Sequence, residues 1–219
     1  MKDSMSGKRI LIVLGGTWHD FDGFAWIIGP VLRKAGHSVE TTYSLDSLKT
    51  LDQGRYDLAL LYTCLTAQRE DGSPATAVLT DVHALPLTKW VSAGGGLLAV
   101  HGATVSGQSS HVFRRLVGGA FVKHPPACRF TVHSVGNEHP ITRGTTDFEV
   151  EDELYIEEYE PDVVVHAVAI HEGIARPQVW TRTEGSGKVA HVALGHDEKV
   201  WSLTVYQSLL LGAVGWLAG

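Results

Sequence analysis

The sequence predicts an α/β domain in which a mostly parallel sheet is flanked by helices. Two observations favour this fold class: short β-branched apolar runs alternate with segments of helical period in the N-terminal half, and glycine turns separate them. A third is the change to successive β-branched and aromatic runs after residue 128, which predicts added antiparallel or edge strands. We expect the 219 residues to form one domain over 1–219, with 1–8 flexible.

The N-terminal half reads as strand, turn and helix in repeated order. Residues 9–14 (RILIVL) are typical of a strand buried on both faces of a parallel sheet. Asp20 is the expected N-cap of a helix that ends at Gly36, and Pro30 should either kink this helix or begin its second half. The elements expected next are strands at 38–43 and 56–63, a helix at 74–93 weakened at Pro86, and a strand at 97–101.

The C-terminal half is expected to consist mainly of strands and to close with a helix. The β-branched and aromatic runs lie at 129–135, 148–156, 163–170, 177–183 and 188–194. The apolar positions of the last helix extend from Leu203 to Leu217.

Composition narrows the classes of function. The net charge is −6 without a dense basic run, so nucleic acid is not an expected partner, and an anionic domain gains nothing from an acidic membrane surface. Residues 1–8 hold no apolar signal segment, and the run 10–14 is too short for a signal peptide or a membrane span. Cys64 and Cys128 make neither a disulfide framework nor a zinc knuckle, so we expect a cytoplasmic protein.

The most informative segment is LLAVHGA, residues 97–103. A buried strand that ends in a small-residue turn before a helix is the geometry of a nucleophile elbow, which lifts one side chain above the carboxyl edge of the sheet. Here that side chain is His101, which can serve as general base, general acid, metal ligand or hydrogen-bond donor. The alternative is a histidine that merely caps the following helix.

Five segments carry a resemblance to a known family. They are GGTWHDF (15–21), GGGLLAVHGA (94–103), KHPPACRFTVHSVGNEHPITRG (123–144), EDELY (151–155) and HVALGHDEKVW (191–201). In this order and spacing the chain resembles the ThuA-like family, which is named for a trehalose-utilisation protein and belongs to the class I glutamine amidotransferase-like superfamily.

The resemblance implies a flavodoxin-like sheet and a role in sugar metabolism. The sugars implied are disaccharides and their keto-sugar derivatives. It also implies that glutaminase activity is absent, because His101 replaces the elbow cysteine, and Cys64 and Cys128 lie elsewhere. By the same resemblance, His196 occupies the late position of the amidotransferase base histidine, and Glu153 is a candidate mainly because its EDELY motif matches.

Further candidates lie beside these motifs. Trp18 either stacks on a sugar ring or covers the core, whereas His19 has no apolar packing role in that loop and is the better candidate. Glu153 and Tyr155 should face one way and Asp152 and Leu154 the other, although an acidic run is usually a solvated face.

His124 precedes a proline in an extended or turn conformation and is a candidate for substrate binding. His139, also before a proline, is interpreted as part of a structural turn. The remaining histidines are interpreted as structural: His37, His83, His111, His133, His166, His171 and His191.

The candidate site follows from these assignments. The catalytic candidates are His101, His196, Glu153 and His19, and the candidates for sugar contacts are Trp18, Tyr155 and His124. The four catalytic candidates are also the candidate ligands for zinc or a similar divalent ion, although no H-E-x-x-H motif is present. If the strand ends meet, the imidazoles should lie within about 10 Å of one another. Neither His101 nor His196 is expected to pack in the core.

The leading hypothesis is an enzyme that acts on a small-molecule sugar or keto-sugar. The alternatives are a non-catalytic carbohydrate-binding or regulatory module and a structural partner subunit with the same cleft. A serine hydrolase is disfavoured because no G-x-S-x-G ends a strand, and a nicotinamide dehydrogenase because the first turn lacks G-x-G-x-x-G. The identity of the sugar and the formation of a homo-oligomer are left open.

Overall fold

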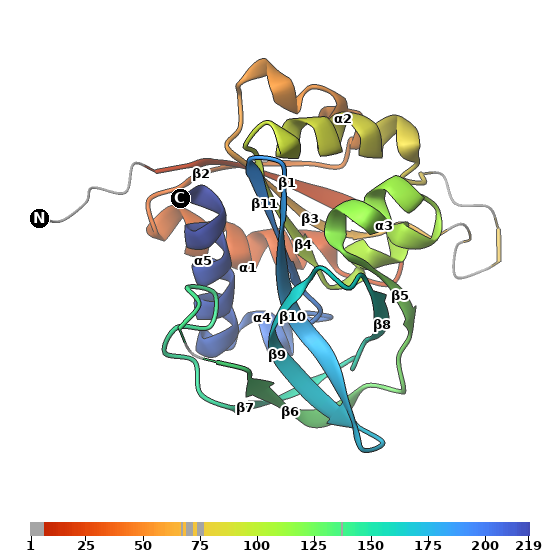
Figure 1. The fold of residues 1–219 in the computed structure, drawn as a ribbon, viewed down its shortest axis with the longest axis vertical. Helices are drawn as coiled ribbons and strands as arrows, with labels where there is room; N and C mark the ends of the chain where they lie inside the picture. The colour runs from red at the N-terminus through yellow and green to blue at the C-terminus, as the bar shows by residue number, and fades with distance from the viewer. Residues whose placement is uncertain (1–6, 67, 69–71, 74–76, 137) are drawn as a thin grey trace, which may run out of the picture.

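A nine-stranded sheet organises the part of the chain that the structure describes, in the order β2-β1-β3-β4-β11-β10-β9-β6-β7 (Figure 1). The structure is a computed structural model and describes residues 7–66, 68, 72–73, 77–136 and 138–219. Two further strands, β5 (Gly119–Lys123) and β8 (Ile156–Tyr159), form a small antiparallel pair beside this sheet.

One half of the large sheet is parallel. Its strands are β2 (Ser38–Thr42), β1 (Arg9–Gly16), β3 (Leu58–Cys64), β4 (Gly96–Val100) and β11 (Gly187–Val192). Every residue of β3 and of β4 is buried, as expected for strands covered on both faces. Because these strands run in the same direction, their carboxyl ends lie at one edge of the sheet.

The other half is antiparallel and curls back on the first. It consists of β10 (Ile174–Glu184), β9 (Val164–His171), β6 (Cys128–Ser134) and β7 (Phe148–Asp152). In a flat sheet, the four strand spacings from β11 to β7 would amount to about 19 Å. Yet a carboxylate oxygen of Asp152, the last residue of β7, lies 2.7 Å from the backbone nitrogen of Gly195, shortly after β11. The antiparallel half therefore reaches the carboxyl edge of the parallel half.

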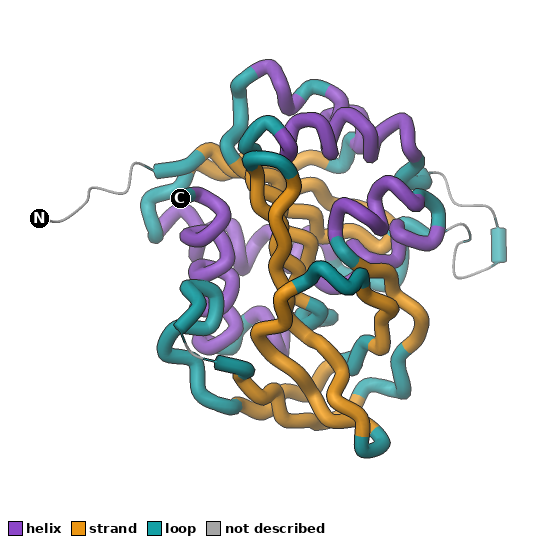
Figure 2. The backbone as a smooth tube through the Cα atoms, in the orientation of Figure 1, coloured by secondary structure: helices purple, strands orange, loops and turns teal. Residues whose placement is uncertain are grey.

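Helices cover both faces of the sheet (Figure 2). On one face lie α1 (Phe21–Lys34), the short α4 (Glu198–Trp201) and α5 (Thr204–Ala218), which pack in the same core. On the other face lie the 3-10 segments η1 (Leu45–Lys49) and η2 (Leu51–Gln53) with α2 (Asp81–Ser92) and α3 (His111–Val117).

Strand β1 shows how one apolar run supplies both cores. Ile10, Ile12 and Leu14 pack with α1 and α5, whereas Leu11 and Val13 pack with α2 and α3. This alternation is the consequence of side chains pointing to opposite faces along a strand. The predicted α/β fold class, with a flavodoxin-like parallel sheet and added antiparallel strands, is confirmed.

The local sequence predicted the start of α1 correctly but not that of the second helix, α2. Asp20 caps α1 by accepting the backbone N–H of Gly23 at 2.8 Å, and Pro30 lies inside this helix, which is continuous from Phe21 to Lys34. The second helix begins at Asp81, so its expected start at residue 74 is wrong; residues 77–80 are not helical, and 74–76 lie outside the described residues. Thr80 is extended there, and its N–H is accepted by the His83 imidazole at 3.3 Å.

The single strand expected at 148–156 is divided into two. β7 pairs with β6 as far as Asp152, and β8 begins at Ile156 with a different partner, β5. Residues 153–155 therefore cross between two sheets without strand pairing. Of the segment expected to be flexible, residues 1–6 lie outside the described residues.

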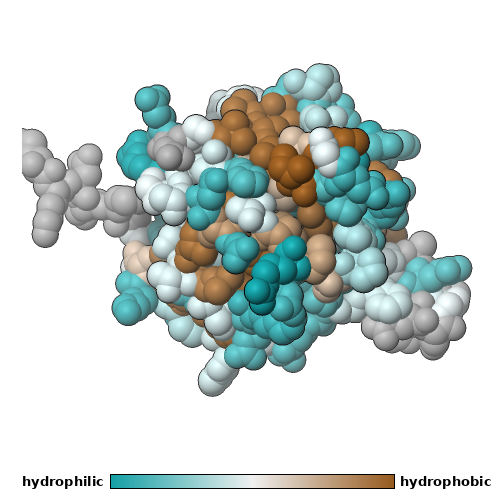
Figure 3. Space-filling view, turned by 90° about the horizontal axis from the view of Figure 1, so that it is seen from below, coloured by the Kyte–Doolittle hydropathy of each residue, from teal (hydrophilic) through white to brown (hydrophobic). Residues whose placement is uncertain are grey.

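The surface mixes polar and apolar groups. Figure 3 shows brown hydrophobic patches separated by hydrophilic residues on the face seen from below. Among the described residues, no helix is both long and apolar enough to cross a bilayer. Both cysteines are free, Cys64 buried and Cys128 half-buried.

Candidate functional site

The turn after β4 holds His101 in a left-handed backbone conformation. His101 has a φ of 48° and begins the 3-10 segment η3 (His101–Gln108), directly beyond the carboxyl end of β4. Such a φ is uncommon for a residue with a side chain, and backbone strain of this kind gathers at functional sites. A Cβ on Gly102 would lie 2.9 Å from the carbonyl oxygen of Thr63, so the turn has no room for one. This is the geometry of an elbow.

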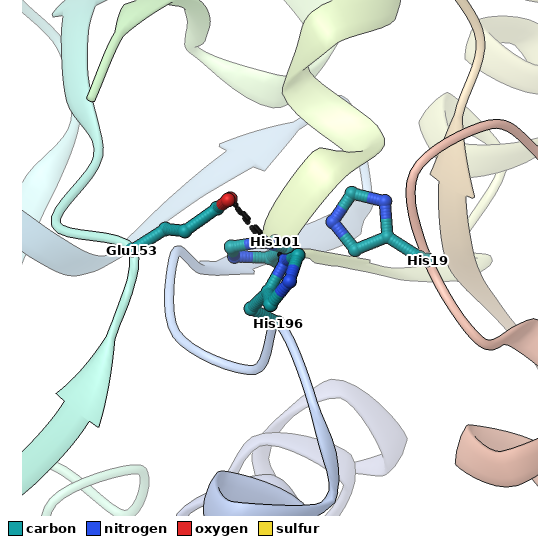
Figure 4. A group of neighbouring side chains, drawn as sticks. All are labelled: His19, His101, Glu153 and His196. Atoms are coloured by element: carbon teal, nitrogen blue, oxygen red, sulfur yellow. Dashed lines mark ion pairs between the residues drawn. The ribbon is translucent and has the colours of Figure 1, made fainter. Parts of the chain in front are cut away.

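Three imidazoles and one carboxylate meet above this turn (Figure 4). They belong to His19 after β1, His101 after β4, His196 after β11 and Glu153 after β7. One potential ligand atom from each lies within 4.8 Å of those of the others. The ring centroids of His101 and His196 are 5.7 Å apart, and each lies 4.9 Å from that of His19. The three imidazoles therefore lie closer together than the limit of about 10 Å expected from the spacing of the strands.

Backbone carbonyls orient two of the imidazoles. Nδ1 of His101 lies 2.6 Å from the carbonyl oxygen of Ala193, and Nδ1 of His19 lies 3.0 Å from that of Thr17. A carbonyl only accepts hydrogen bonds, so each Nδ1 donates, and in a neutral imidazole the lone pair is then on Nε2. Both Nε2 atoms, and Nδ1 of His196, are buried without a hydrogen-bond partner among the described residues. Three ring nitrogens that make no hydrogen bond among the described residues therefore lie close together, and two of them are within 3.4 Å of the Glu153 carboxylate.

This donor set fits a divalent metal ion. Oε2 of Glu153 lies 3.4 Å from Nε2 of His101 and 3.3 Å from Nδ1 of His196. Zinc–ligand bonds of about 2.1 Å in a tetrahedron place neighbouring ligand atoms about 3.4 Å apart. Metal-binding histidines also donate their second N–H to a carbonyl or carboxylate, as His19 and His101 do here. The two distances to Glu153 match this geometry, and all four side chains present donor atoms within 4.8 Å of one another, so together they form a candidate set of ligands for such an ion.

Burial and neighbouring charge set the protonation of the group. Burial, reinforced by the nearby His101, lowers the pKa of His19 to about 3, so this imidazole is neutral at pH 7. Burial alone would raise the pKa of Glu153, but its ion pairs with His101 and His196 outweigh that effect and hold the pKa well below its usual range. The same pairing raises the pKa of His196. A neutral imidazole and an ionised carboxylate are the forms that bind a cation, so His19 and Glu153 have the binding form at pH 7, whereas a cation would have to compete with the proton that Glu153 stabilises on His196.

His101 is part of the packed interior. Its side chain is fully buried and its ring stacks on that of Tyr155, with centroids 4.1 Å apart. The expectation that neither His101 nor His196 packs in the core is therefore wrong for His101. His196 keeps 28% of its side chain exposed. The difference arises because Tyr155, from the segment that crosses between the two sheets, covers only the first of these rings.

A pocket of about 580 Å³ opens directly above the cluster. Its lining combines aromatic and aliphatic side chains with a few polar groups: Trp18, His19, Cys64, Thr66, Val105, Gln108, Phe121, His124, Glu153, Tyr155 and His196. Its volume is that of a small-molecule site, and apolar walls with few converging polar groups are the usual composition of such sites.

The residues expected to contact a sugar lie around this pocket. Trp18 is 53% exposed with a φ of 72°, so it does not cover the core. Nε2 of His124 lies 3.6 Å from Oε1 of Glu153, and its Nδ1 donates to the carbonyl of Pro125 at 2.8 Å. Glu153 and Tyr155 line the pocket together, whereas Leu154 is buried in the core.

The other histidines lie elsewhere. His139 stacks on His166 with ring centroids 4.0 Å apart, and neither lines the pocket. The same holds for the remaining histidines that the sequence marked as structural, His37, His83, His111, His133, His171 and His191.

Cys64 lies in the pocket, although the sequence placed it away from the site. It is the last residue of β3, and the rule that located His19 and His101 at strand ends applies to it equally. Burial raises the pKa of its thiol to about 12. The thiol is therefore protonated at neutral pH and is not poised as a nucleophile.

A buried ion pair behind the pocket escaped the sequence reasoning altogether. Glu157 belongs to the acidic run read as a solvated face, but only 1% of its side chain is exposed. One carboxylate oxygen lies 3.1 Å from Nε2 of His191, and the other accepts the hydroxyl of Thr104 at 2.5 Å. No local pattern marks Glu157, because its partners lie on β11 and η3.

Fold and site together define an α/β protein with a flavodoxin-like parallel sheet and a histidine at the elbow after β4. The profile of the ThuA family, described as trehalose utilisation, matches residues 9–217, so the chain belongs to the ThuA family.

Solved structures share the fold at low sequence identity. A ThuA-like protein from Parabacteroides merdae has a TM-score of 0.76 at 16% identity, over 97% of this chain and 90% of that one. One from Bacteroides uniformis has a TM-score of 0.74 at 16% identity, over 99% and 94%. A cytoplasmic protein from Salmonella typhimurium LT2 has a TM-score of 0.68 at 13% identity, over 95% and 99%. No curated protein matches by sequence.

Proposed function

We propose that this protein is a metal-dependent enzyme that acts on a sugar or keto-sugar derived from a disaccharide. The observation that carries the proposal is the set of three buried, unbonded imidazole nitrogens and one carboxylate at the base of the pocket. Buried polar atoms without partners are costly, and a bound cation would satisfy all of them at once. The trehalose-utilisation description of the family favours a sugar as the substrate.

In this proposal, His19, His101, His196 and Glu153 hold the ion. A bound divalent ion supplies Lewis acidity, which polarises a carbonyl or lowers the pKa of a coordinated hydroxyl or water. Glu153 would neutralise part of the charge of such an ion, and its Oε1 faces His124.

His124 is the group suited to move a proton in the pocket. Its Nδ1 carries a hydrogen because it bonds to the Pro125 carbonyl, and its Nε2 faces Glu153 at the pocket wall. The side chain is 32% exposed, so it can meet a bound substrate. It would receive a proton from a sugar hydroxyl, or return one, at Nε2.

Aromatic rings would bind the sugar itself. Trp18 offers an exposed indole at the pocket and Tyr155 a phenol in its wall. Sugar rings present C–H faces that pack on such surfaces, while hydroxyls pair with polar groups such as Gln108 and Thr66. We place this activity in the cytoplasm, the compartment named for the Salmonella neighbour.

Metal binding and turnover test the proposal. Protein stripped with a chelator would be titrated calorimetrically with Zn²⁺, Co²⁺ and Mn²⁺, with H196A as the matched control. Trehalose, other disaccharides and their keto derivatives would then be incubated with metal-loaded protein and followed by mass spectrometry. We expect one ion per chain and metal-dependent product. Metal binding without product, together with retained sugar binding, would favour the non-catalytic module; absence of metal binding would refute the proposal.

A further inference from the structure

A buried carboxylate behind the cluster contacts the backbone of two of its members. Asp152 ends β7 and is 2% exposed. Its Oδ2 accepts the backbone N–H of Gly195 at 2.7 Å, and its Oδ1 accepts those of His196 at 3.1 Å and Glu153 at 2.9 Å. One carboxylate thus binds the backbone on both sides of the curled sheet.

The loop that carries His196 is held from its carbonyl side as well. The hydroxyl of Tyr62 donates to the carbonyl oxygen of Gly195 at 2.9 Å and to that of His196 at 3.1 Å. The indole N–H of Trp201 donates to the Gly195 carbonyl at 2.6 Å. Gly195 has a φ of 119°, and a Cβ there would lie 2.4 Å from the hydroxyl oxygen of Tyr206. The backbone of this loop is therefore fixed on all sides.

The chemistry of the contact requires a carboxylate. Three N–H donors converge on two oxygens, and an ionised carboxylate can accept all of them without presenting a hydrogen of its own. An asparagine would place an NH₂ group against one of the N–H donors. An alanine would leave all three donors without their acceptor in a buried setting, which destabilises the loop.

We propose that Asp152 is a positioning residue of the candidate metal site, which sets the distance between His196 and Glu153 by anchoring the backbone of both. This inference rests on the proposed function for its consequence, metal affinity, but its geometric content stands on the hydrogen bonds alone. Oε2 of Glu153 and Nδ1 of His196 are 3.3 Å apart. The two residues come from opposite halves of the sheet, so no local segment fixes that separation. Asp152 supplies the missing constraint.

Metal titration separates a positioning role from a merely structural one. D152N and D152A would be titrated with Zn²⁺, and with Co²⁺ to follow the visible spectrum of the bound ion. We expect affinity to fall about 10- to 100-fold, the range for residues that orient metal ligands, with D152A the weaker binder. T181V is the control, because it removes the buried 2.7 Å contact between Thr181 and His166, and neither residue lines the pocket. It should lose stability but keep wild-type affinity.

Amide exchange gives a readout that needs no metal. In the wild-type protein, the backbone N–H groups of Glu153, Gly195 and His196 should exchange slowly, and D152N should release these three while core amides stay protected. Fast exchange of these three N–H groups in the wild-type protein would overturn the proposal. So would a folded D152N variant whose amide exchange and metal affinity are unchanged. If wild type binds no metal, the proposed function fails, and exchange alone decides the role of Asp152. If both variants fail to fold, the wild-type exchange still decides.

Discussion

The two halves of the sheet contribute to the site in different ways. The parallel half supplies His19, His101 and His196, each from the turn or loop that follows a strand, because parallel strands end at one edge. The antiparallel half supplies Glu153, which lies in the segment that crosses from β7 to β8. Its carboxylate reaches the imidazoles only because the sheet curls, bringing Asp152 within 2.7 Å of Gly195.

The comparison shows that the site has two structural origins. Strand order and direction bring the three imidazoles together, whereas the curl of the sheet brings Glu153 to them. Imidazoles at parallel strand ends would gather in any sheet of this order. The carboxylate that would complete the proposed cation site depends on long-range packing. The halves should therefore respond differently to substitution.

Removing an imidazole from the parallel half should have the largest effect. H101A and H196A each delete a ring nitrogen that faces the common point, so we expect metal affinity to fall more than about 100-fold, beyond the range for residues behind the ligands. Turnover should be lost with it. H101A should also lower the free energy of unfolding by about 1–3 kcal/mol, because its buried ring stacks on Tyr155. Calorimetry measures the metal affinity, and urea unfolding measures the free energy of unfolding. Unchanged metal affinity in a folded variant would contradict the assignment of that histidine as a ligand.

Neutralising the antiparallel contribution should have a smaller effect. E153Q keeps the shape and one carbonyl oxygen, which can still bind a metal weakly, so we expect a loss of about 10- to 100-fold. E151Q is the matched control, since Glu151 is exposed and pairs with Lys199 outside the pocket. If E153Q lost as much metal affinity as H101A, the carboxylate from the antiparallel half would matter as much as an imidazole from the parallel half.

The antiparallel half should also carry a pH dependence of stability unrelated to metal. Burial lowers the pKa of His166 to about 4, so between about 6.5 and 4 the unfolded chain binds a proton that the folded one does not. The free energy of unfolding should fall as pH is lowered through this window, by up to about 1.4 kcal/mol per pH unit. H166Q should flatten that slope in urea unfolding while metal affinity at pH 7 stays unchanged. Equal slopes in both proteins would contradict the assignment.

The smallest effect is expected at Cys64, the member of the parallel edge that is not a ligand. Burial raises the pKa of its thiol to about 12, so the thiol is protonated at neutral pH, and we predict that it takes no part in turnover. C64S should keep metal affinity and turnover within a few-fold of wild type, as should C128S. A folded C64S without turnover would mean that thiol chemistry had been dismissed wrongly.

The sequence by itself determined the parallel sheet, its elbow and the positions of three histidines. These follow from local patterns: a buried β-branched run, a glycine turn and a helix cap each act within a few residues. Asp20 capping α1 is such a case, since donor and acceptor lie three residues apart. The shared edge then follows from strand direction alone.

Only the tertiary structure decided which acidic residues are buried and which face the pocket. Glu153 and Glu157 belong to the same acidic run, yet one faces the imidazoles and the other pairs with His191 behind them. Asp152 gained its place in the same way. The physical reason is that the energy of a buried charge is set by partners far away in sequence, and here the curl of the antiparallel strands chooses those partners.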